Sequence, residues 1–544
     1  MSYHEDLIKR ASQPYIVKCP RHYTPNAALI EEINKGEFVS EETAFHNYFS
    51  TMQRVDPDYF FQLERMVNNR QKLGFTNNSQ LQIVVPAYRE GPSMSCFLRQ
   101  IKDQCNNYGQ LPCDFTFVFD HAVPYRNRYE NTARKEMELA IKLFLESFPE
   151  ISPHINFVSY KRRKSTNEPV LPVGLARKVG EDVLMLERLR KKEESSVELP
   201  PLYLGLMDID TSNLSFGLFE EMHNLLPSLS TENPRIVRVQ GSYDRNWLRM
   251  YPQLHALEMM WEGVFSAIGN KTRHNPFNIG RLSAVPAREL AITGGGFPGK
   301  LNFTDEDIRH GIQIAWQLKN IQTVEPKGKY ATSPRREIHT VNGVKQLLSE
   351  SSDLTVDLLQ CAALIKMYAH WSQNMYRDQA TPHEDALLTY DAFMQHTSAP
   401  LIEGFTNAFF RFTAFSIIAI DELSDLAPEI TELKNKFLSG EIAYFEVELG
   451  TIDFLRQLSK NPERTASLLS KLQNIVKKST DIISQILQKN GIDFDLLDLS
   501  EIPLGINEGN VNAFLHLDPN QILQPVYKIH GDLTAYYDNF VKML

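Results

Sequence analysis

Cysteine is scarce in this sequence and forms no metal or redox motif. Only 5 cysteines occur among 544 residues, and no two of them make a Cys-x-x-Cys pair. An odd, sparse set in a chain of this length indicates reduced thiols rather than a disulfide framework. The sequence therefore predicts an intracellular, cytoplasmic protein.

Long hydrophobic runs and an excess of basic residues are missing as well. The opening residues, MSYHEDLIKR, lack the apolar core of a signal peptide. The most apolar run, 408–420, contains Arg411 and is too short to cross a membrane, so we expect a buried helix there. A formal net charge of −10 argues against a nucleic-acid partner, because phosphate contacts need a basic face. We expect a soluble protein with no transmembrane segment.

Short apolar, β-branched segments alternate with helical patterns through the middle of the chain. Strands are expected at 81–88, 114–120, 155–160 and 202–208, with helices between them at 93–105, 131–148 and 174–192. Such alternation builds βαβ units, so it predicts an α/β fold with a mostly parallel sheet and helices on both faces.

The two ends of the chain have a different pattern. Residues 1–78 predict a helical segment, with helices at 41–55 and 59–74, and beyond about 345 only amphipathic helix patterns remain. We therefore expect a helical N-terminal segment at 1–78, the α/β domain at 79–345 and an all-helical C-terminal domain at 346–544. The last domain can form a homo-oligomer, close over the active site or bind a partner.

Two aspartates follow the last expected strand of the series, in LYLGLMDIDTSN at 202–213. Ligands of open α/β sheets bind beyond the carboxyl ends of the strands, and residues i and i+2 of an extended segment point to the same side. Asp208 and Asp210 can therefore approach one cation, since hard divalent ions take carboxylate and phosphate oxygens. The alternative is a solvated turn, because Asp-x-Asp also occurs at 56/58, 305/307 and 493/495.

Five segments in chain order resemble the motifs of family 2 glycosyltransferases of the GT-A fold. They are IVVPAYRE (83–90), GLARKVGEDVL (174–184), MDIDTS (207–212), ITGGGFPGKLNFTDEDIRHGIQIA (292–315) and TSPRRE (332–337). The resemblance spans roughly 81–340. The sequence departs from the family pattern at Arg89, at Asp120-His121-Ala122, at Lys178 and at His310.

The resemblance implies a metal-dependent transferase with a Rossmann-like GT-A fold. It would move a sugar from a nucleoside diphosphate sugar to a hydroxyl acceptor whose identity the sequence leaves open, with Mn²⁺ or Mg²⁺ as cofactor. Asp210 would be the main metal ligand, with Asp208 nearer the ribose or the outer shell of the metal and His339 as a third ligand. Asp307, beside Glu306, would be the general base of an inverting displacement.

The same resemblance assigns binding residues for donor and acceptor. Residues expected to bind the nucleotide sugar are Pro86, Ala87, Tyr88, Glu90, Asp120, Gly174, Arg177, Asp208, Arg335 and Arg336. Residues expected to bind the acceptor are Gly295 and Gly296, whose backbone allows close approach, and the aromatic Trp247.

Each assignment has a structural alternative. Asp307 follows Thr304 at a helix start, where acidic residues offset the helix dipole. Tyr88 fits a core-edge aromatic, Arg335 and Arg336 a surface pair, and His339 a structural histidine.

Other functions fit the pattern too. The two main alternative functions are a retaining GT-A enzyme that acts on a small polar acceptor and a non-catalytic scaffold that keeps the fold. A nucleotidyltransferase fits less well, because no glycine-rich phosphate loop follows the first strand.

Overall fold

The computed structural model describes the greater part of the chain up to residue 332 and parts of it beyond 413. The described residues are 3–11, 13–75, 79–87, 91–105, 110–121, 128–162, 172–194, 199–209, 211–229, 233–243, 282–296, 306–332, 414, 417–418, 421–426, 428–458, 461, 463–464, 467–468 and 470–471. The chain divides into two compact units. The first comprises Met1–Asp244, Pro276–Ser333 and Leu438–Ala443, and it contains every described strand.

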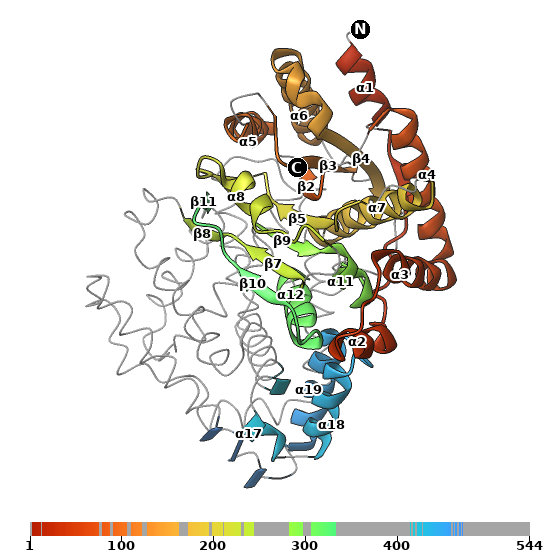
Figure 1. Cartoon of the computed structure of the whole chain (residues 1–544), viewed down its shortest axis with the longest axis vertical. Coiled ribbons are helices and arrows are strands. Elements are labelled where there is room, and N and C mark those ends of the chain that lie inside the picture. The colour runs from red at the N-terminus through yellow and green to blue at the C-terminus, as the bar shows by residue number, and fades with distance from the viewer. Residues whose placement is uncertain are drawn as a thin grey trace, which may run out of the picture. The chain divides into compact units, whose positions relative to one another are not determined.

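An eight-stranded sheet forms the middle of this first unit (Figure 1). Its strands, in spatial order, are β1 (Tyr15–Val17), β4 (Ile155–Arg162), β3 (Asp114–His121), β2 (Leu81–Ala87), β5 (Tyr203–Met207), β9 (Leu282–Pro286), β7 (Arg235–Arg238) and β10 (Gln322–Val324). Only β9 runs antiparallel to its neighbours, β5 and β7. The predicted α/β fold, with a mostly parallel sheet, is confirmed.

The central strand β2 shows why this region forms a covered sheet. All seven of its residues are buried, because it is apolar on both faces. Ile83 and Val85 pack into one hydrophobic core, whereas Val84 packs into another on the opposite side of the sheet. Alternate residues therefore bind the two helical layers to the same strand.

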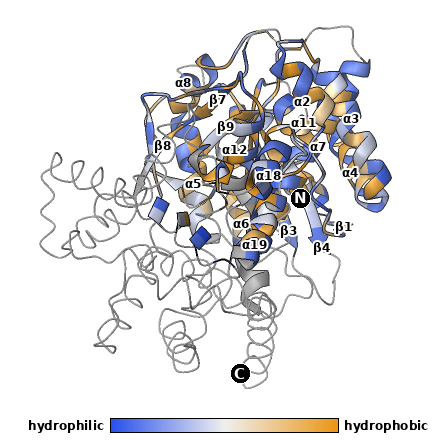
Figure 2. Ribbon diagram, turned by 90° about the horizontal axis from the view of Figure 1, so that it is seen from below, coloured by the Kyte–Doolittle hydropathy of each residue, from blue (hydrophilic) through white to orange (hydrophobic). Residues whose placement is uncertain are grey.

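Helices cover both faces of the sheet, as predicted. One face packs against α1 (Tyr3–Ala11), α5 (Gly91–Asp103), α6 (Arg128–Ser147) and α8 (Leu218–Asn224). The other packs against α7 (Pro172–Glu194), which lies beside the N-terminal helices α3 (Glu41–Val55) and α4 (Pro57–Lys72) in Figure 1, and against α2 (Ala27–Asn34) and α11 (Ala287–Ile292). In Figure 2, α3 and α4 show both hydrophobic and hydrophilic residues, as expected for amphipathic helices.

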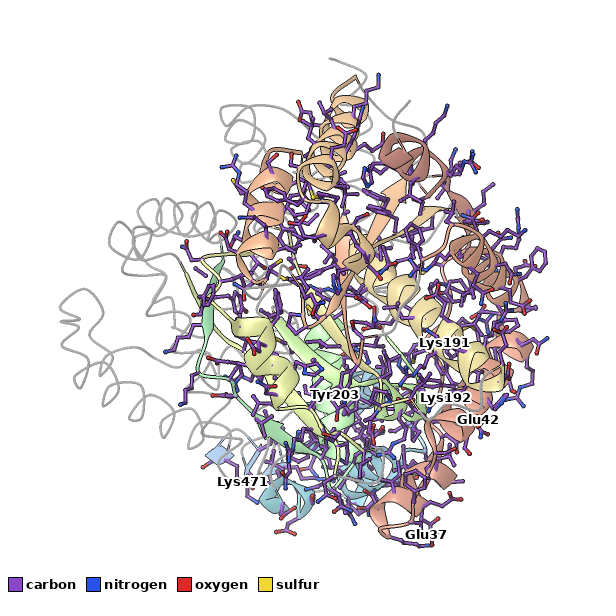
Figure 3. All side chains as sticks on the ribbon, turned by 45° about the horizontal axis from the view of Figure 1, so that its top comes forward. Glu37, Glu42, Lys191, Lys192, Tyr203 and Lys471 are labelled. Carbon is purple, nitrogen blue, oxygen red and sulfur yellow. The ribbon has the colours of Figure 1, made fainter. Side chains whose placement is uncertain are left out.

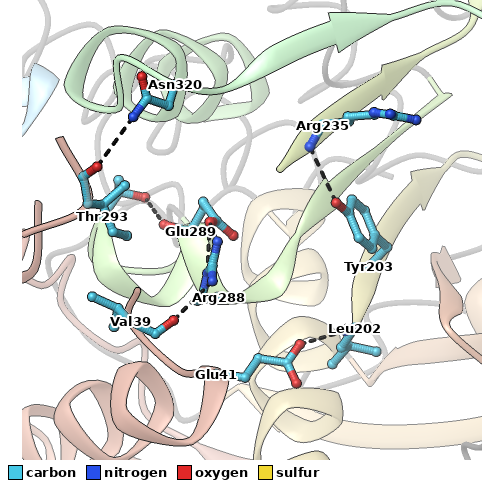
Figure 4. Close-up of polar contacts among 10 residues, drawn as sticks. Val39, Glu41, Leu202, Tyr203, Arg235, Arg288, Glu289, Thr293 and Asn320 are labelled. Carbon is cyan, nitrogen blue, oxygen red and sulfur yellow. Dashed lines mark hydrogen bonds and ion pairs between the residues drawn. The ribbon is translucent and has the colours of Figure 1, made fainter. Parts of the chain in front are cut away.

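The N-terminal segment is joined to the sheet in two ways. Strand β1 adds to its edge by pairing in parallel with β4, Tyr15 opposite Tyr160. Glu41, at the start of α3, accepts a hydrogen bond from the backbone N–H of Leu202 just before β5 (Figure 4) and forms an ion pair of 2.7 Å with Lys192, labelled near the end of α7 in Figure 3. Residues 1–78 thus belong to the same compact unit as the sheet.

A buried polar network fixes α3 and α4 to α7. The carboxylate of Asp182 accepts hydrogen bonds from the hydroxyls of Tyr48 (2.7 Å) and Tyr59 (2.8 Å). Lys178, one turn earlier on α7, donates to the Tyr48 hydroxyl at 2.7 Å and lies 3.2 Å from Asp182. The side chains of Lys178 and Asp182 are both 0% exposed, so protein contacts replace water around this pair.

A second, small sheet lies at the end of β5. It consists of β6 (Thr211–Ser212), β11 (Lys329–Thr332) and β8 (Gln240–Tyr243), with β11 in the middle. β6 follows β5 directly, so this sheet holds the segment that carries the Asp-x-Asp pair.

Beyond residue 413 the described elements are helical. They are α17 (Asp421–Ser424), α18 (Pro428–Leu438) and α19 (Tyr444–Leu458). No described helix is both long and apolar enough to span a membrane. The domain boundaries at 78 and 345 stay predictions.

Candidate functional site

The order of the strands creates a switch point between β2 and β5. From β2 the chain proceeds to β3 and then β4 on one side, and β5 is then added on the other side of β2. At such a point the connections diverge and leave a crevice at the carboxyl ends of the strands, which is where ligands of open α/β sheets bind.

Several predicted site residues lie at these carboxyl ends. Pro86 and Ala87 are the last two residues of β2, and they pair with Val118 and Phe119 of β3. Asp120 is the next residue of β3 and is buried. Asp208 follows β5 directly. The structure therefore brings the predicted nucleotide-binding residues of three neighbouring strands to one edge of the sheet.

An ion pair joins this edge to α7. Nη2 of Arg177 donates to Oδ1 of Asp208 at 2.9 Å, and the side chains are 7% and 33% exposed, respectively. The other oxygen, Oδ2, has no hydrogen bond or ion pair with the described residues. One carboxylate oxygen thus accepts from the guanidinium, and the other can accept from a metal-bound water or bind a cation, which suits the oxygen preference of Mg²⁺ and Mn²⁺.

The N-terminus of α7 contributes to the same place. This helix connects β4 to β5, two parallel strands, so it runs back along the sheet and begins at the carboxyl edge. Gly174 and Arg177 both lie in its first two turns and are buried. The positive end of the helix dipole and the guanidinium therefore favour an anion at this edge.

The helix α12 (Glu306–Gln317) begins with the two predicted catalytic acids, Glu306 and Asp307. His310, one turn after Asp307, is buried, and its pKa is lowered to about 3 by burial first and then by the charges of Lys178 and Arg177. The charges of Lys178 and Arg177 on α7 therefore act on His310 of α12. The side chains of Glu306 and Asp307 are outside the described residues.

The low pKa of His310 predicts a pH-dependent stability. The unfolded chain protonates this histidine near pH 6.5 but the folded protein only near pH 3, so the unfolded state binds the extra proton between these values. The free energy of unfolding should then fall as pH drops below 6.5, by about 1.4 kcal/mol per unit from this group alone. Urea unfolding of the wild type and His310→Leu between pH 5 and 8 measures it. The difference between the two should be constant above pH 7 and change below 6.5, and a constant difference throughout would contradict the assignment.

The glycine loop after α11 packs tightly rather than opening to solvent. Gly294 and Gly295 have φ angles of +99° and +76°, which favour glycine. A Cβ on Gly295 would lie 2.1 Å from the Tyr48 hydroxyl oxygen, and one on Gly296 would lie 2.2 Å from a carboxylate oxygen of Glu181. The positive φ angles of Gly294 and Gly295 favour glycine here, and a role for Gly295 and Gly296 in acceptor binding stays a prediction.

The remaining predicted site residues lie outside the described part of the chain. They are Tyr88, Glu90, Asp210, Trp247, Arg335, Arg336 and His339. Among the residues that are described, no group of three or more His, Cys, Asp or Glu side chains is arranged to hold a metal. Of the predicted metal ligands, only Asp208 is therefore placed.

Comparisons with known proteins give distant matches only. No family model and no curated protein matches the chain. Among solved structures, the mannosyltransferase PcManGT from Pyrobaculum calidifontis, in complex with GDP-Man and Mn²⁺, matches at 12% identity with a TM-score of 0.31 and covers 78% of this chain and 96% of its own. The structure of residues 1–349 of S. aureus TarS matches at 14% identity with a TM-score of 0.27. The structure of the same residues in complex with UDP matches at 13% identity with a TM-score of 0.28. Each covers 68% of this chain and 90% of its own. Matches this weak establish no activity, so we infer function from the site.

Proposed function

We propose that this protein is a metal-dependent glycosyltransferase that moves a sugar from a nucleoside diphosphate sugar to a hydroxyl acceptor. The observation that carries the proposal is the Arg177–Asp208 pair at the switch point between β2 and β5. A carboxylate bound through one oxygen to a buried guanidinium, next to a helix N-terminus, suits a ligand that carries both a cation and a diphosphate.

The donor would bind along the carboxyl edge of the sheet. Pro86, Ala87 and the turn after them would contact the nucleoside, with Asp120 as an acceptor for a base N–H. Asp210 would be the main ligand of Mn²⁺ or Mg²⁺. Because Arg177 already donates to one oxygen of Asp208, this carboxylate would make only a secondary contact with the metal or the ribose. When bound, the metal ion would supply charge neutralisation on the leaving diphosphate.

Two further groups would act on the reaction itself. Asp307, at the start of α12, would remove the proton of the acceptor hydroxyl as it attacks the anomeric carbon, which gives inversion. Its support is its place in the first turn of α12, one turn before the buried His310. Arg335 and Arg336 follow β11, which pairs with β6 beside the aspartates, and would stabilise the departing diphosphate. His339 would be a third metal ligand. The anomeric configuration of the product would distinguish a retaining mechanism from an inverting one.

A thermal-shift screen tests the proposal. UDP-, GDP- and dTDP-sugars are each added with Mn²⁺ or Mg²⁺, and the matching donor at about 100 times its dissociation constant should stabilise the fold by about 2.7 kcal/mol. Asp210→Asn should remove the metal-dependent part of this stabilisation, because a neutral amide binds divalent ions less strongly than a carboxylate.

Asp58→Asn serves as the control, because Asp58 belongs to another Asp-x-Asp pair and is an exposed residue of α4. It should keep the full metal-dependent shift. If no nucleotide sugar stabilises the wild type with either metal, the proposed activity is wrong. If the Asp210→Asn variant keeps the whole shift, the metal assignment alone is wrong.

A further inference from the structure

The segment Asp208–Ser215, which carries the Asp-x-Asp pair, is held from the side by a glutamine of α5. Nε2 of Gln100 donates to the carbonyl oxygen of Thr211 at 3.1 Å, and Oε1 of Gln100 accepts from the backbone N–H of Leu214 at 3.3 Å. One side-chain amide thus bonds to both sides of a turn, as a neighbouring strand would.

A second glutamine supports the same segment. Gln104 lies in the turn that directly follows the last residue of α5, Asp103. Its Nε2 donates to the carbonyl oxygen of Ser215 at 3.0 Å. On the opposite side of the segment, Thr211 and Ser212 pair with β11, and Ser215 exchanges hydrogen bonds of 2.8 and 2.9 Å with Lys329.

These contacts fix the chain on both sides of Asp210. Before it, β5 ends at Met207, Arg177 holds the side chain of Asp208, and Ile209 is buried. After it, Thr211 is held by Gln100, by β11 and by a backbone hydrogen bond of 3.1 Å to the carbonyl oxygen of Asp208. Among the described residues of α5, only Gln100 binds this segment through both a donor and an acceptor.

The helix that carries Gln100 also begins at the other half of the site. α5 starts at Gly91, directly after residues 88–90 of the chain, two of which (Tyr88 and Glu90) we assign to the nucleotide sugar. The helix therefore connects the chain after β2 to the segment that follows β5, through the hydrogen bonds of Gln100.

We propose that Gln100 is a positioning residue that sets the Asp-x-Asp turn for binding of a divalent cation with a nucleoside diphosphate. This role rests on the proposed function and adds to it a residue with no direct contact to metal or donor. Residues that support metal ligands from behind typically change metal affinity by about 10–100-fold when replaced.

Two measurements on the full chain test it. Gln100→Met keeps the length of the side chain and removes both hydrogen bonds. Binding of Mn²⁺, followed by the EPR signal of the free ion in the presence of UDP or of GDP, should weaken by about tenfold. Without any ligand, amide hydrogen exchange of a peptide covering 208–216 should be about fivefold faster, because Leu214 loses its acceptor.

Two more variants complete the experiment. Gln53→Met replaces an exposed glutamine of α3 and should change neither result. Gln100→Glu keeps an acceptor for Leu214 but loses the donor to Thr211, so it should restore the slow exchange of Leu214 while Mn²⁺ binding stays weakened.

The outcomes separate the two proposals. Unchanged Mn²⁺ affinity or unchanged exchange in Gln100→Met overturns the positioning role and leaves the proposed activity in place. Absence of Mn²⁺ and nucleotide binding in the wild type and in Gln53→Met overturns the proposed activity and the positioning role with it, whatever the exchange rates are.

Discussion

Replacement of Asp307 by asparagine is expected to lower the rate constant of sugar transfer by about 10²–10⁴-fold while donor binding stays intact. The carboxylate would accept the proton of the acceptor hydroxyl, and loss of a positioned general base typically has an effect of this size. The asparagine side chain has nearly the same shape but does not take a proton at neutral pH. Single-turnover transfer at saturating donor, together with a donor titration by thermal shift, measures the two quantities separately.

The competing explanation for Asp307 is stabilisation of the start of α12. An acidic residue in the first turn of a helix contributes about 0.3–1 kcal/mol through the helix dipole. Asp58→Asn is a matched control, because Asp58 lies in the first turn of α4 and is exposed. If Asp307→Asn lowers stability by as much as Asp58→Asn and leaves the transfer rate unchanged, Asp307 acts only on the helix.

Replacement of Asp182 by asparagine is expected to destabilise the protein by about 3–5 kcal/mol. The substitution leaves the Lys178 ammonium buried without an opposite charge, and breaking one partner of a buried ion pair has this cost. Burial first, and then the charge of Asp182, raise the pKa of Tyr48 and Tyr59 well above the ordinary value, so both phenols stay protonated and donate to the carboxylate. Urea denaturation at pH 7 measures the loss.

The double variant Lys178→Met with Asp182→Asn separates the charge from the hydrogen bonds. It should recover part of the stability lost in Asp182→Asn, because no charge is left unpaired. Tyr59→Phe removes a single hydrogen bond and should cost about 1 kcal/mol. A double variant that is less stable than Asp182→Asn would show that the buried charge is not the cause.

The sheet was predictable from the sequence because its strands are apolar on both faces. The segments 81–88, 114–120, 155–160 and 202–208 became β2, β3, β4 and β5, with ends that differ by two residues at most. Strand β1 was missed, since three residues show no periodicity and the pairing with β4 depends on contacts far along the chain. Strands β7 and β9 were missed as well, because their order and direction follow from tertiary packing rather than local pattern.

Within the site, motifs indicated which residues carry chemistry but not what supports them. Asp208 and Arg177 were expected from the resemblance, but their ion pair was not. Lys178 and Asp182 have the i,i+4 spacing of an exposed pair, so their spacing alone does not indicate that they are buried. A signal was present: α7 also buries Val179, Val183 and Leu186 beside them, so apolar residues lie on several sides of the helix.

The network on Asp182 also bears on how the chain is made. Tyr48 and Asp182 are 134 residues apart. At a translation rate of about 5–20 residues per second, Tyr48 is synthesised roughly 7–27 seconds before Asp182. During that interval α7 is not yet present for the apolar side of the N-terminal helices to pack against. We therefore expect ribosome-associated chaperones to bind the nascent chain at this stage.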